Sequence, residues 1–288
     1  MKKIFQTMIR IENNLKLFKS TTTTGINFNK DIIQNEIKLL VVSVLSELQE
    51  DDLVVAAKLI EFSNEELIHL TKIHYDLEKK EIDGKEYILE NIIIQFPESV
   101  LRKQSITFIS TRSSGLDKGY NTLIMSKSIT KLNKLFLHWL KSNQGLIIKS
   151  LTFNSSFSIQ IFKYLIRNIN DLQELGDIEI DFDTSFTQNG SLNTISVEIK
   201  NIELQKFKNS EDGHDDEVAS GIFKYLELST TLNFNRLEIS RLKTDLLTIQ
   251  SSGKLNFKKI PKLAKNDFVF FTTFDFILMI YENLVKVV

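Results

Sequence analysis

One segment, residues 232–257, constrains the fold more than any other part of the chain. Its sequence is LNFNRLEISRLKTDLLTIQSSGKLNF. Apolar and polar residues alternate along it, which is typical of β-strands, and the Ser251-Ser252-Gly253 cluster is typical of a turn. The segment therefore predicts two or three strands joined by a short turn.

Two earlier segments, residues 178–183 and 194–200, alternate in the same way. Each has one apolar and one polar face, as expected of a sheet that is covered on one side only. Parallel strands, which are buried on both faces, usually read as continuous apolar runs. We therefore expect these strands to pair in an antiparallel sheet.

The N-terminal part mixes helical and strand patterns. Residues 3–19 favour a strand, and Asp31 is a plausible start for a helix. The apolar positions of that helix are Ile33, Ile37, Leu40, Val44 and Leu48. Ser63 and Glu66 form a capping box, which predicts a second helix to about Asp76. The segment between these helices, residues 53–60, fits either a helix or a buried strand.

After Gly84 the pattern changes to a meander of three antiparallel strands over residues 87–96, 105–111 and 121–125. A helix follows from Ser128, with Gly145 just beyond its end. Further helices are predicted in the C-terminal half of the chain. They begin at Ser155 or Ser156 and at about Glu203, and another covers residues 218–228.

We expect an α+β fold with predominantly antiparallel (mixed) sheets, flanking helices and two closely packed lobes. The predicted boundary near Ser126 separates residues 1–126, with helices and then the meander, from an α+β lobe at 127–288. The chain has 288 residues, a net charge of −1 and no Cys, which excludes disulfide frameworks and thiolate metal sites. Asp275 interrupts the apolar run at 268–281, so we expect a core-facing terminal helix or strand and no membrane span.

One enzyme hypothesis rests on Asp181 and Asp183, which end an apolar strand as Asp-x-Asp. This motif resembles the opening of haloacid-dehalogenase-type phosphotransferases, in which the first Asp attacks phosphorus and the second is the general acid. Ser185 stands where that motif requires Thr or Val, and the expected antiparallel pairing does not suit that fold. A solvated acidic strand face explains the pattern better.

No other motif predicts a cofactor or a metal. The acidic run at 211–217 lacks the alternate-residue spacing of an EF-hand, and His69 and His74 are not spaced to share one helical face. Phosphate-binding glycine motifs are absent from the sequence. We therefore expect no cofactor and no metal site.

A local group of cations lies in and after the late strands. We predict a candidate DNA-facing surface there, formed by Arg236, Arg241, Lys243, Lys254 and Lys258. Cations on one surface can neutralise phosphates, although the net charge provides no global positive field. The alternative is a charged sheet face or edge that discourages aggregation.

The order of patterns from Ser128 onward resembles the centromere protein L family of the inner kinetochore. The residues that carry the resemblance are the stretch NKLFLHWLKSNQGLIIKSLTFN, the strand pair at 178–182 and 194–199, the helix at 202–207, the late strands with Arg241-Leu242 and Gly253-Lys254, and the apolar end at 277–285. The resemblance covers mainly the C-terminal half of the chain.

The resemblance implies a non-catalytic subunit in the nucleus, at the centromere and kinetochore. Its partners would be a centromere protein N relative and other inner-kinetochore subunits, with DNA contact through the heterodimer. A sheet edge suits such pairing, and the apolar candidates for the interface are Leu237, Ile239, Leu246, Ile249, Leu255 and Phe257. An intramolecular core explains these residues equally well, and an unrelated scaffold protein remains an alternative.

Overall fold

The computed structural model describes residues 14–21, 30–51, 62–96, 102–111, 121–168, 172–184, 193–208, 215–230, 232–258 and 273–285. These residues form two compact units. The first contains Lys16–Ser150 together with residues 279–285, and the second contains Leu151–Leu278. The predicted helix or strand at 53–60 lies outside the described residues.

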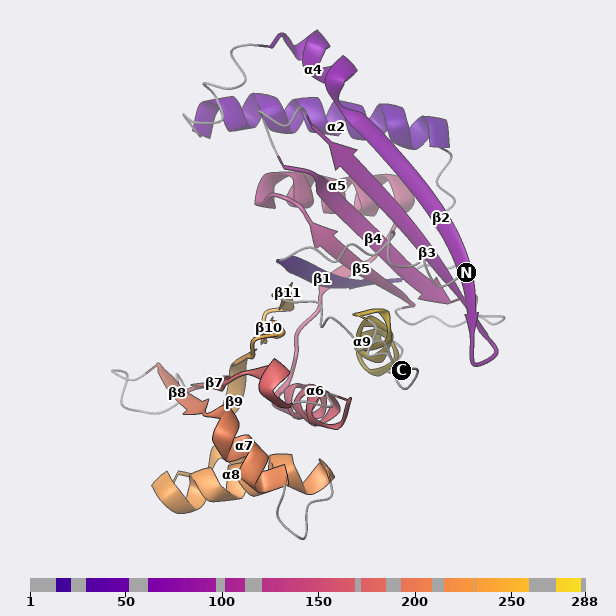
Figure 1. Ribbon diagram of the computed structural model, residues 1–288. Coiled ribbons are helices and arrows are strands. Elements are labelled where there is room, and N and C mark those ends of the chain that lie inside the picture. Colours follow the sequence, from indigo (N-terminus) through magenta and orange to yellow (C-terminus); the bar gives the residue numbers. More distant parts are fainter. Residues whose placement is uncertain are drawn as a thin grey trace. The chain divides into compact units, whose positions relative to one another are not determined.

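The first unit is built on an antiparallel sheet (Figure 1). The order of its strands is β2 (Lys72–Ile82), β3 (Lys85–Gln95), β4 (Gln104–Thr111), β5 (Thr122–Lys127) and β1 (Leu15–Ser20), and β6 (Ile148–Ser150) also pairs with β1. The predicted meander is confirmed as β3, β4 and β5. The pairing of β2 with β3 extends it by a strand that the sequence analysis did not predict.

Two helices, α2 (Lys30–Asp51) and α5 (Thr130–Gln144), cover one face of this sheet (Figure 1). Their buried residues pack with Ile92, Ile106 and Phe108 of the strands in one apolar cluster. Trp139 of α5 donates a hydrogen bond from Nε1 to the Glu36 carboxylate of α2 at 2.6 Å. Both helices were predicted from the spacing of their apolar residues, which is the spacing that places one face on a core.

The capping box is confirmed, but the predicted length of its helix is wrong. Ser63 accepts a hydrogen bond from the Glu66 backbone and Glu66 accepts one from the Ser63 backbone, at the start of α4 (Asn64–Leu70). The backbone of Thr71 is already extended, and strand β2 begins at Lys72 instead of continuing the helix to Asp76. Pairing with β3 along the whole length of β2 outweighs the local helical spacing.

The C-terminal apolar segment, predicted as a helix or a strand, forms a helix, α9 (Thr273–Ile280), which continues into a π-helical turn, Tyr281–Val285. In the first unit, the Tyr281 hydroxyl accepts a hydrogen bond from the Thr111 backbone at 3.1 Å and donates one to the Asn121 carbonyl at 2.8 Å. The ring of Tyr281 also meets the ring of Tyr87 edge to face. These contacts attach the end of the chain to the sheet of the first unit.

The second unit has its own antiparallel strands. Their order is β11 (Lys254–Phe257), β10 (Leu247–Gln250), β9 (Glu238–Lys243), β7 (Ile178–Asp183) and β8 (Thr194–Ile199). The late segment thus forms three strands, at the upper limit of the prediction. The helices of this unit include α6 (Ser155–Asn168), α7 (Asn201–Lys208) and α8 (Asp215–Thr230), with single 3-10 turns at Leu172–Leu175 and Phe234–Arg236.

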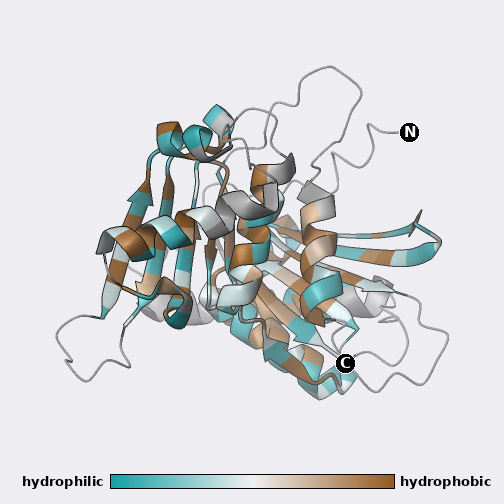
Figure 2. Cartoon of the chain, turned by 90° about the horizontal axis from the view of Figure 1, so that it is seen from below, coloured by the Kyte–Doolittle hydropathy of each residue, from teal (hydrophilic) through white to brown (hydrophobic). Residues whose placement is uncertain are grey.

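An aromatic cluster forms part of the core of the second unit. The ring centroid of Phe182 in β7 lies 4.9 Å from the ring centroid of Phe234 and 6.5 Å from that of Phe223 in α8. Figure 2 shows hydrophobic and hydrophilic residues alternating along the strands, as expected when one face of a sheet is buried and the other is polar. The observed architecture confirms the predicted α+β fold with antiparallel sheets.

Three details differ from the sequence analysis. The side chain of Asn154, rather than Ser155 or Ser156, accepts the hydrogen bond from the Phe157 backbone at the start of α6. Helix α8 begins at Asp215, inside the acidic run at 211–217 and before the predicted start at residue 218. The strand before Ser126 and the helix after it belong to the same unit, because α5 packs on the meander, so the chain divides after Ser150.

Candidate functional site

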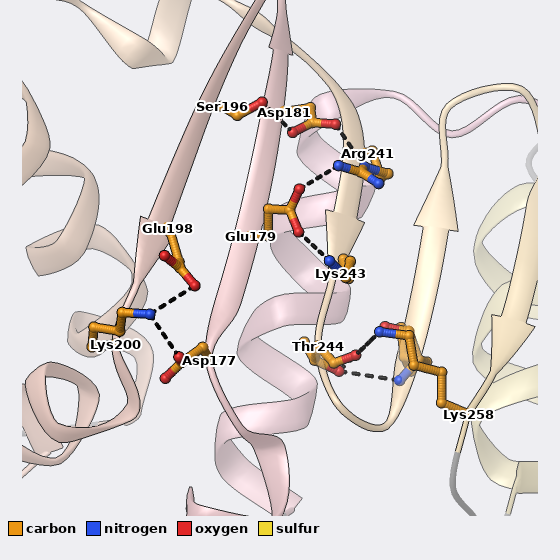
Figure 3. A network of polar contacts seen from close by, with 11 residues as sticks. Asp177, Glu179, Asp181, Ser196, Glu198, Lys200, Arg241, Lys243, Thr244 and Lys258 are labelled. Atoms are coloured by element: carbon orange, nitrogen blue, oxygen red, sulfur yellow. Dashed lines mark hydrogen bonds and ion pairs between the residues drawn. The ribbon is translucent and has the colours of Figure 1, made fainter.

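The polar face of β7 and β9 carries a cluster of charged side chains (Figure 3). Antiparallel pairing places Glu179 opposite Lys243 and Asp181 opposite Arg241. Their neighbours along the strands, including Ile180 and Leu242, are buried on the other face. The alternation that was visible in the sequence therefore gathers two acids and two bases on one surface.

Arg241 links both carboxylates. Its Nε donates to Oδ2 of Asp181 at 2.6 Å, and its Nη2 donates to Oε1 of Glu179. Lys243 donates from Nζ to the other oxygen of Glu179. Ser196 of β8 donates from Oγ to Oδ1 of Asp181 at 2.8 Å, so the network ties together three neighbouring strands.

The burial of this network is graded. The side chain of Asp181 is 12% exposed, whereas those of Arg241 and Lys243 are 33% and 41% exposed. The hydrogen bond from Lys243, with the nearby positive charges, lowers the pKa of Glu179. The hydrogen bond to Asp181 in turn raises the pKa of Arg241. Both groups are thus held in their charged forms, as expected of a charge-assisted hydrogen-bonded pair.

A β-bulge lies beside this network. The register of β7 against β9 shifts between Asp181 and Phe182, and Ser240 donates from its hydroxyl to the Asp181 carbonyl at 3.1 Å. A bulge re-aims the side chains next to it. Here the bulge lies between Ile239 and Arg241 of β9. The side chain of Arg241 reaches the acids, whereas that of Ile239 lies in the core.

A second ion-pair group lies at the other end of β7 and β8. Lys200 donates to Asp177 at 3.0 Å and lies 2.8 Å from a carboxylate oxygen of Glu198. The backbone of Asn201 donates a further hydrogen bond to Asp177, and this bond is the main cause of its lowered pKa. These side chains are largely exposed, so the pairs contribute little to stability.

The predicted DNA-facing cations fall into two groups. Arg241 and Lys243 are paired with acids, and Lys258 donates from Nζ to the Thr244 carbonyl at 2.7 Å. Burial is the main cause of the lowered pKa of Lys258. Arg236 and Lys254 are exposed, and neither forms an ion pair with any residue that the structure describes. A DNA-facing surface here stays a prediction. Binding to phosphates requires cations that are not already paired with acids, and within the described residues Arg236 and Lys254 meet this requirement.

The predicted interface residues lie mostly in the core. Leu237 is half-buried, and the other five are buried: Ile239, Leu246, Ile249, Leu255 and Phe257. Strands β9 and β10 also have paired neighbours on both sides, so neither offers an edge to a partner. A role for these residues in an interface stays a prediction. In the structure, Ile239, Ile249, Leu255 and Phe257 belong to the apolar face of the sheet.

The strand that ends the sheet of the second unit is β8, which the sequence analysis predicted as a strand but not as an interface. Within the described residues, β8 pairs only with β7. Its sequence, TISVEI, is rich in β-branched residues and contains a single charged side chain, Glu198. Ile195 and Val197 remain half-exposed. Such a strand presents unpaired backbone groups that another strand can bind.

The other terminal strand, β2, has the opposite character. Along its outer edge and faces it carries many charges: Lys72, Asp76, Glu78, Lys79, Lys80 and Glu81. Natural sheets use such charges to prevent edge-to-edge pairing. Within the described residues, the first unit therefore ends in a charged, protected strand, β2, and the second unit ends in a strand that is open to pairing, β8.

The geometry does not support the phosphotransferase hypothesis. The strand of Asp181 is antiparallel to both of its neighbours, whereas that fold needs parallel strands. Among the described residues, no group of three or more acids and His is placed to hold a metal ion. Most of the acidic run at 211–217 lies outside the described residues. None of the helices in the described ranges has the length and apolar character needed to cross a bilayer.

The fold and the cluster thus define an α+β protein with an ion-pair network that braces its C-terminal sheet. A family model, IML3, matches residues 62–259, and the chain therefore belongs to the IML3 family. IML3 is the yeast counterpart of centromere protein L, a structural component of the kinetochore. The family suggests a kinetochore-related role and a centromeric, nuclear location. The search of curated proteins finds no match.

Proposed function

We propose that this protein is a non-catalytic structural subunit of the inner kinetochore and pairs with a centromere protein N relative. The heterodimer would take part in centromere recognition, kinetochore assembly and chromosome segregation together with other inner-kinetochore subunits. Family membership supports the kinetochore role. The structural observation that supports pairing is strand β8, which ends the C-terminal sheet with few charges and with half-exposed apolar side chains.

The proposed contact is β-augmentation, in which a strand of the partner continues the sheet beside β8. Backbone hydrogen bonds give such a contact affinity, and alternate side chains give it specificity. Ile195 and Val197 lie on the same side of the sheet as Ile180 and Phe182, so a partner's apolar residues would extend an existing core.

A strand alone is smaller than a stable interface, which buries about 1,600 Å². Additional apolar surface therefore has to lie close to β8. Ile202 lies in the first turn of α7, the helix that follows β8 directly, and is 66% exposed. We propose that it belongs to the same interface.

The ion-pair network holds β8 in a fixed position before a partner binds. Ser196 of β8 donates to Asp181, and Asp181 is held by Arg241. A strand fixed in this way loses little conformational freedom when a partner binds, which improves affinity. The polar cluster thus supports an interface and is not itself a reactive site.

DNA contact is a second, separate part of the proposal. Arg236 and Lys254 are exposed cations without ion pairs to described residues, and both can neutralise phosphates. Two cations provide only a weak contact. We therefore propose that the heterodimer, rather than this chain alone, binds DNA.

Affinity purification of the tagged protein tests the partner. We expect recovery of a centromere protein N relative and localisation at centromeres. Recovery of unrelated complexes only, with diffuse localisation through mitosis, would contradict the proposal.

A further inference from the structure

Helix α5 of the first unit has an unusual distribution of charge. Its sequence, TKLNKLFLHWLKSNQ, contains no acidic residue. Its basic residues are Lys131, Lys134, His138 and Lys141. The helix is therefore a local positive element in a protein whose net charge is −1.

Three of these residues share one exposed face. Lys134, His138 and Lys141 follow one another at intervals of four and three residues and are all exposed. With a rise of 1.5 Å per residue, they span about 10 Å along the helix axis. The opposite face, including Leu132 and Phe136, is buried against the sheet.

This face is not neutralised by other described parts of the protein. Lys134 and Lys141 form no ion pair with any described residue, and Ser142 is the neighbour of the His138 ring, at 3.5 Å. Among the described side chains, Glu36 of α2 is an acid that contacts α5, but it binds Trp139 and Asn143. Helical spacing places those two residues on the side of α5 away from Lys134.

Among the lysines of α5, Lys141 alone lies where a cation favours the helix. Its first turn contains Lys131 and no acid, and its N-cap, Ile129, makes no side-chain hydrogen bond. Cations are unfavourable near a helix N-terminus, and like charges on neighbouring positions three residues apart, such as Lys131 and Lys134, repel one another. Lys141 in the last turn is favourable, but Lys131 and Lys134 are not. A departure from local stability rules is expected at functional surfaces.

We propose that the exposed face of α5 binds a short acidic segment of a partner protein, with apolar residues beside its carboxylates. Charge complementarity favours an acidic occupant. The small size of the face and the sequence pI of about 6.5 favour a protein segment over duplex DNA, which usually requires a broader basic surface. Apolar contacts are available from the half-buried Leu137 and from Ile147, which follows the helix and is 60% exposed.

A labelled helical peptide of about fifteen residues, with Glu at intervals of four and three, is a suitable probe. Its binding to the full-length protein is measured by fluorescence anisotropy at low ionic strength. We expect binding that weakens with salt and weakens about tenfold in the Lys134→Glu/Lys141→Glu variant. The Lys134→Arg/Lys141→Arg variant should bind like the unaltered protein, and Lys134→Gln/Lys141→Gln should be intermediate.

The matched control is Lys206→Glu, which reverses an exposed lysine on α7 in the second unit and should change nothing. Circular dichroism verifies that each variant is folded. Failure of the unaltered protein to bind the Glu peptide would overturn the proposal, as would an equal loss in Lys206→Glu. Tighter binding to duplex DNA, abolished in the Lys134→Glu/Lys141→Glu variant, would assign the face to nucleic acid instead. None of these outcomes depends on the pairing proposed for β8.

Discussion

The Nε atom of Arg241 donates a hydrogen bond to Oδ2 of Asp181 at 2.6 Å, across the pairing of β9 with β7. Asp181 is the least exposed member of the network, so Arg241→Ala would leave a largely buried carboxylate without its cation. We expect a loss of about 1–3 kcal/mol in the free energy of unfolding, measured with urea. Lys243→Ala, which removes a more exposed charge, should cost at most about 1 kcal/mol. Equal losses would contradict the graded burial.

The two free cations predict how the heterodimer would bind DNA. Replacing Arg236 or Lys254 by Gln should reduce the salt dependence, the slope of log K against log salt concentration, by about 0.9 for each phosphate that is no longer neutralised. Lys200→Gln is the control, because Lys200 is already paired with Asp177 and Glu198. An unchanged slope in both variants would show that this surface does not bind DNA.

Glu90 is a buried acid in the first unit, 3% exposed, and its carboxylate accepts a hydrogen bond from the Tyr75 hydroxyl at 2.8 Å. Burial raises the pKa of Glu90 from 4.5 to about 7. The folded protein therefore binds more protons than the unfolded chain between these two values, and stability should fall as the pH rises through this window. The fall is at most about 3 kcal/mol.

Glu90→Gln removes the titrating group without changing its size. We expect the pH dependence of thermal unfolding between pH 4.5 and about 7 to become flatter, with the variant gaining most at the upper end of the range. If thermal unfolding of the variant depended on pH as strongly as that of the unaltered protein, ionisation of Glu90 would not destabilise the folded state, and the prediction would be contradicted.

Gly176 and Gly145 form a natural pair for a backbone test. Both have positive φ angles, +68° and +64°, where an L side chain is strained. A Cβ at Gly176 would lie 2.3 Å from a carboxylate oxygen of Asp245, whereas a Cβ at Gly145 would meet nothing within 4 Å. We expect Gly145→Ala to cost about 1 kcal/mol and Gly176→Ala about 2–4 kcal/mol in chemical unfolding. The reverse order would contradict this packing.

Much of the fold could be predicted because its strands alternate and its helices have one apolar face. The segments that became β7, β8 and the late strands carry the period of two, and α5 carries helical spacing with Gly145 as its C-cap. The same reasoning failed at β2. Leu67, Leu70 and Ile73 happen to follow helical spacing, but the pairing with β3 decides the structure after Leu70.

The site could be predicted less well, because it depends on register between distant segments. The acidic pair Glu179 and Asp181 and the basic pair Arg241 and Lys243 have the same two-residue spacing. That match was the available signal for their pairing, but the bulge beside Asp181 and the order of strands could not be read from it. For the same reason, the sequence predicted β8 as a strand, but only the fold shows that β8 ends the sheet of the second unit.

The central claim is that a partner pairs along β8, and Val197→Lys tests it most directly. A lysine in an edge strand opposes the addition of another strand, and Val197 is half-exposed, so the fold should tolerate the change. The matched control is Leu77→Lys in β2, where the wild-type side chain is 50% exposed in the terminal strand of the other unit. The measurement is quantitative recovery of the centromere protein N relative with each tagged variant, after circular dichroism has shown that both are folded. We predict strong loss of the partner with Val197→Lys and normal recovery with Leu77→Lys. Full recovery with Val197→Lys, or equal loss with both variants, would contradict the account.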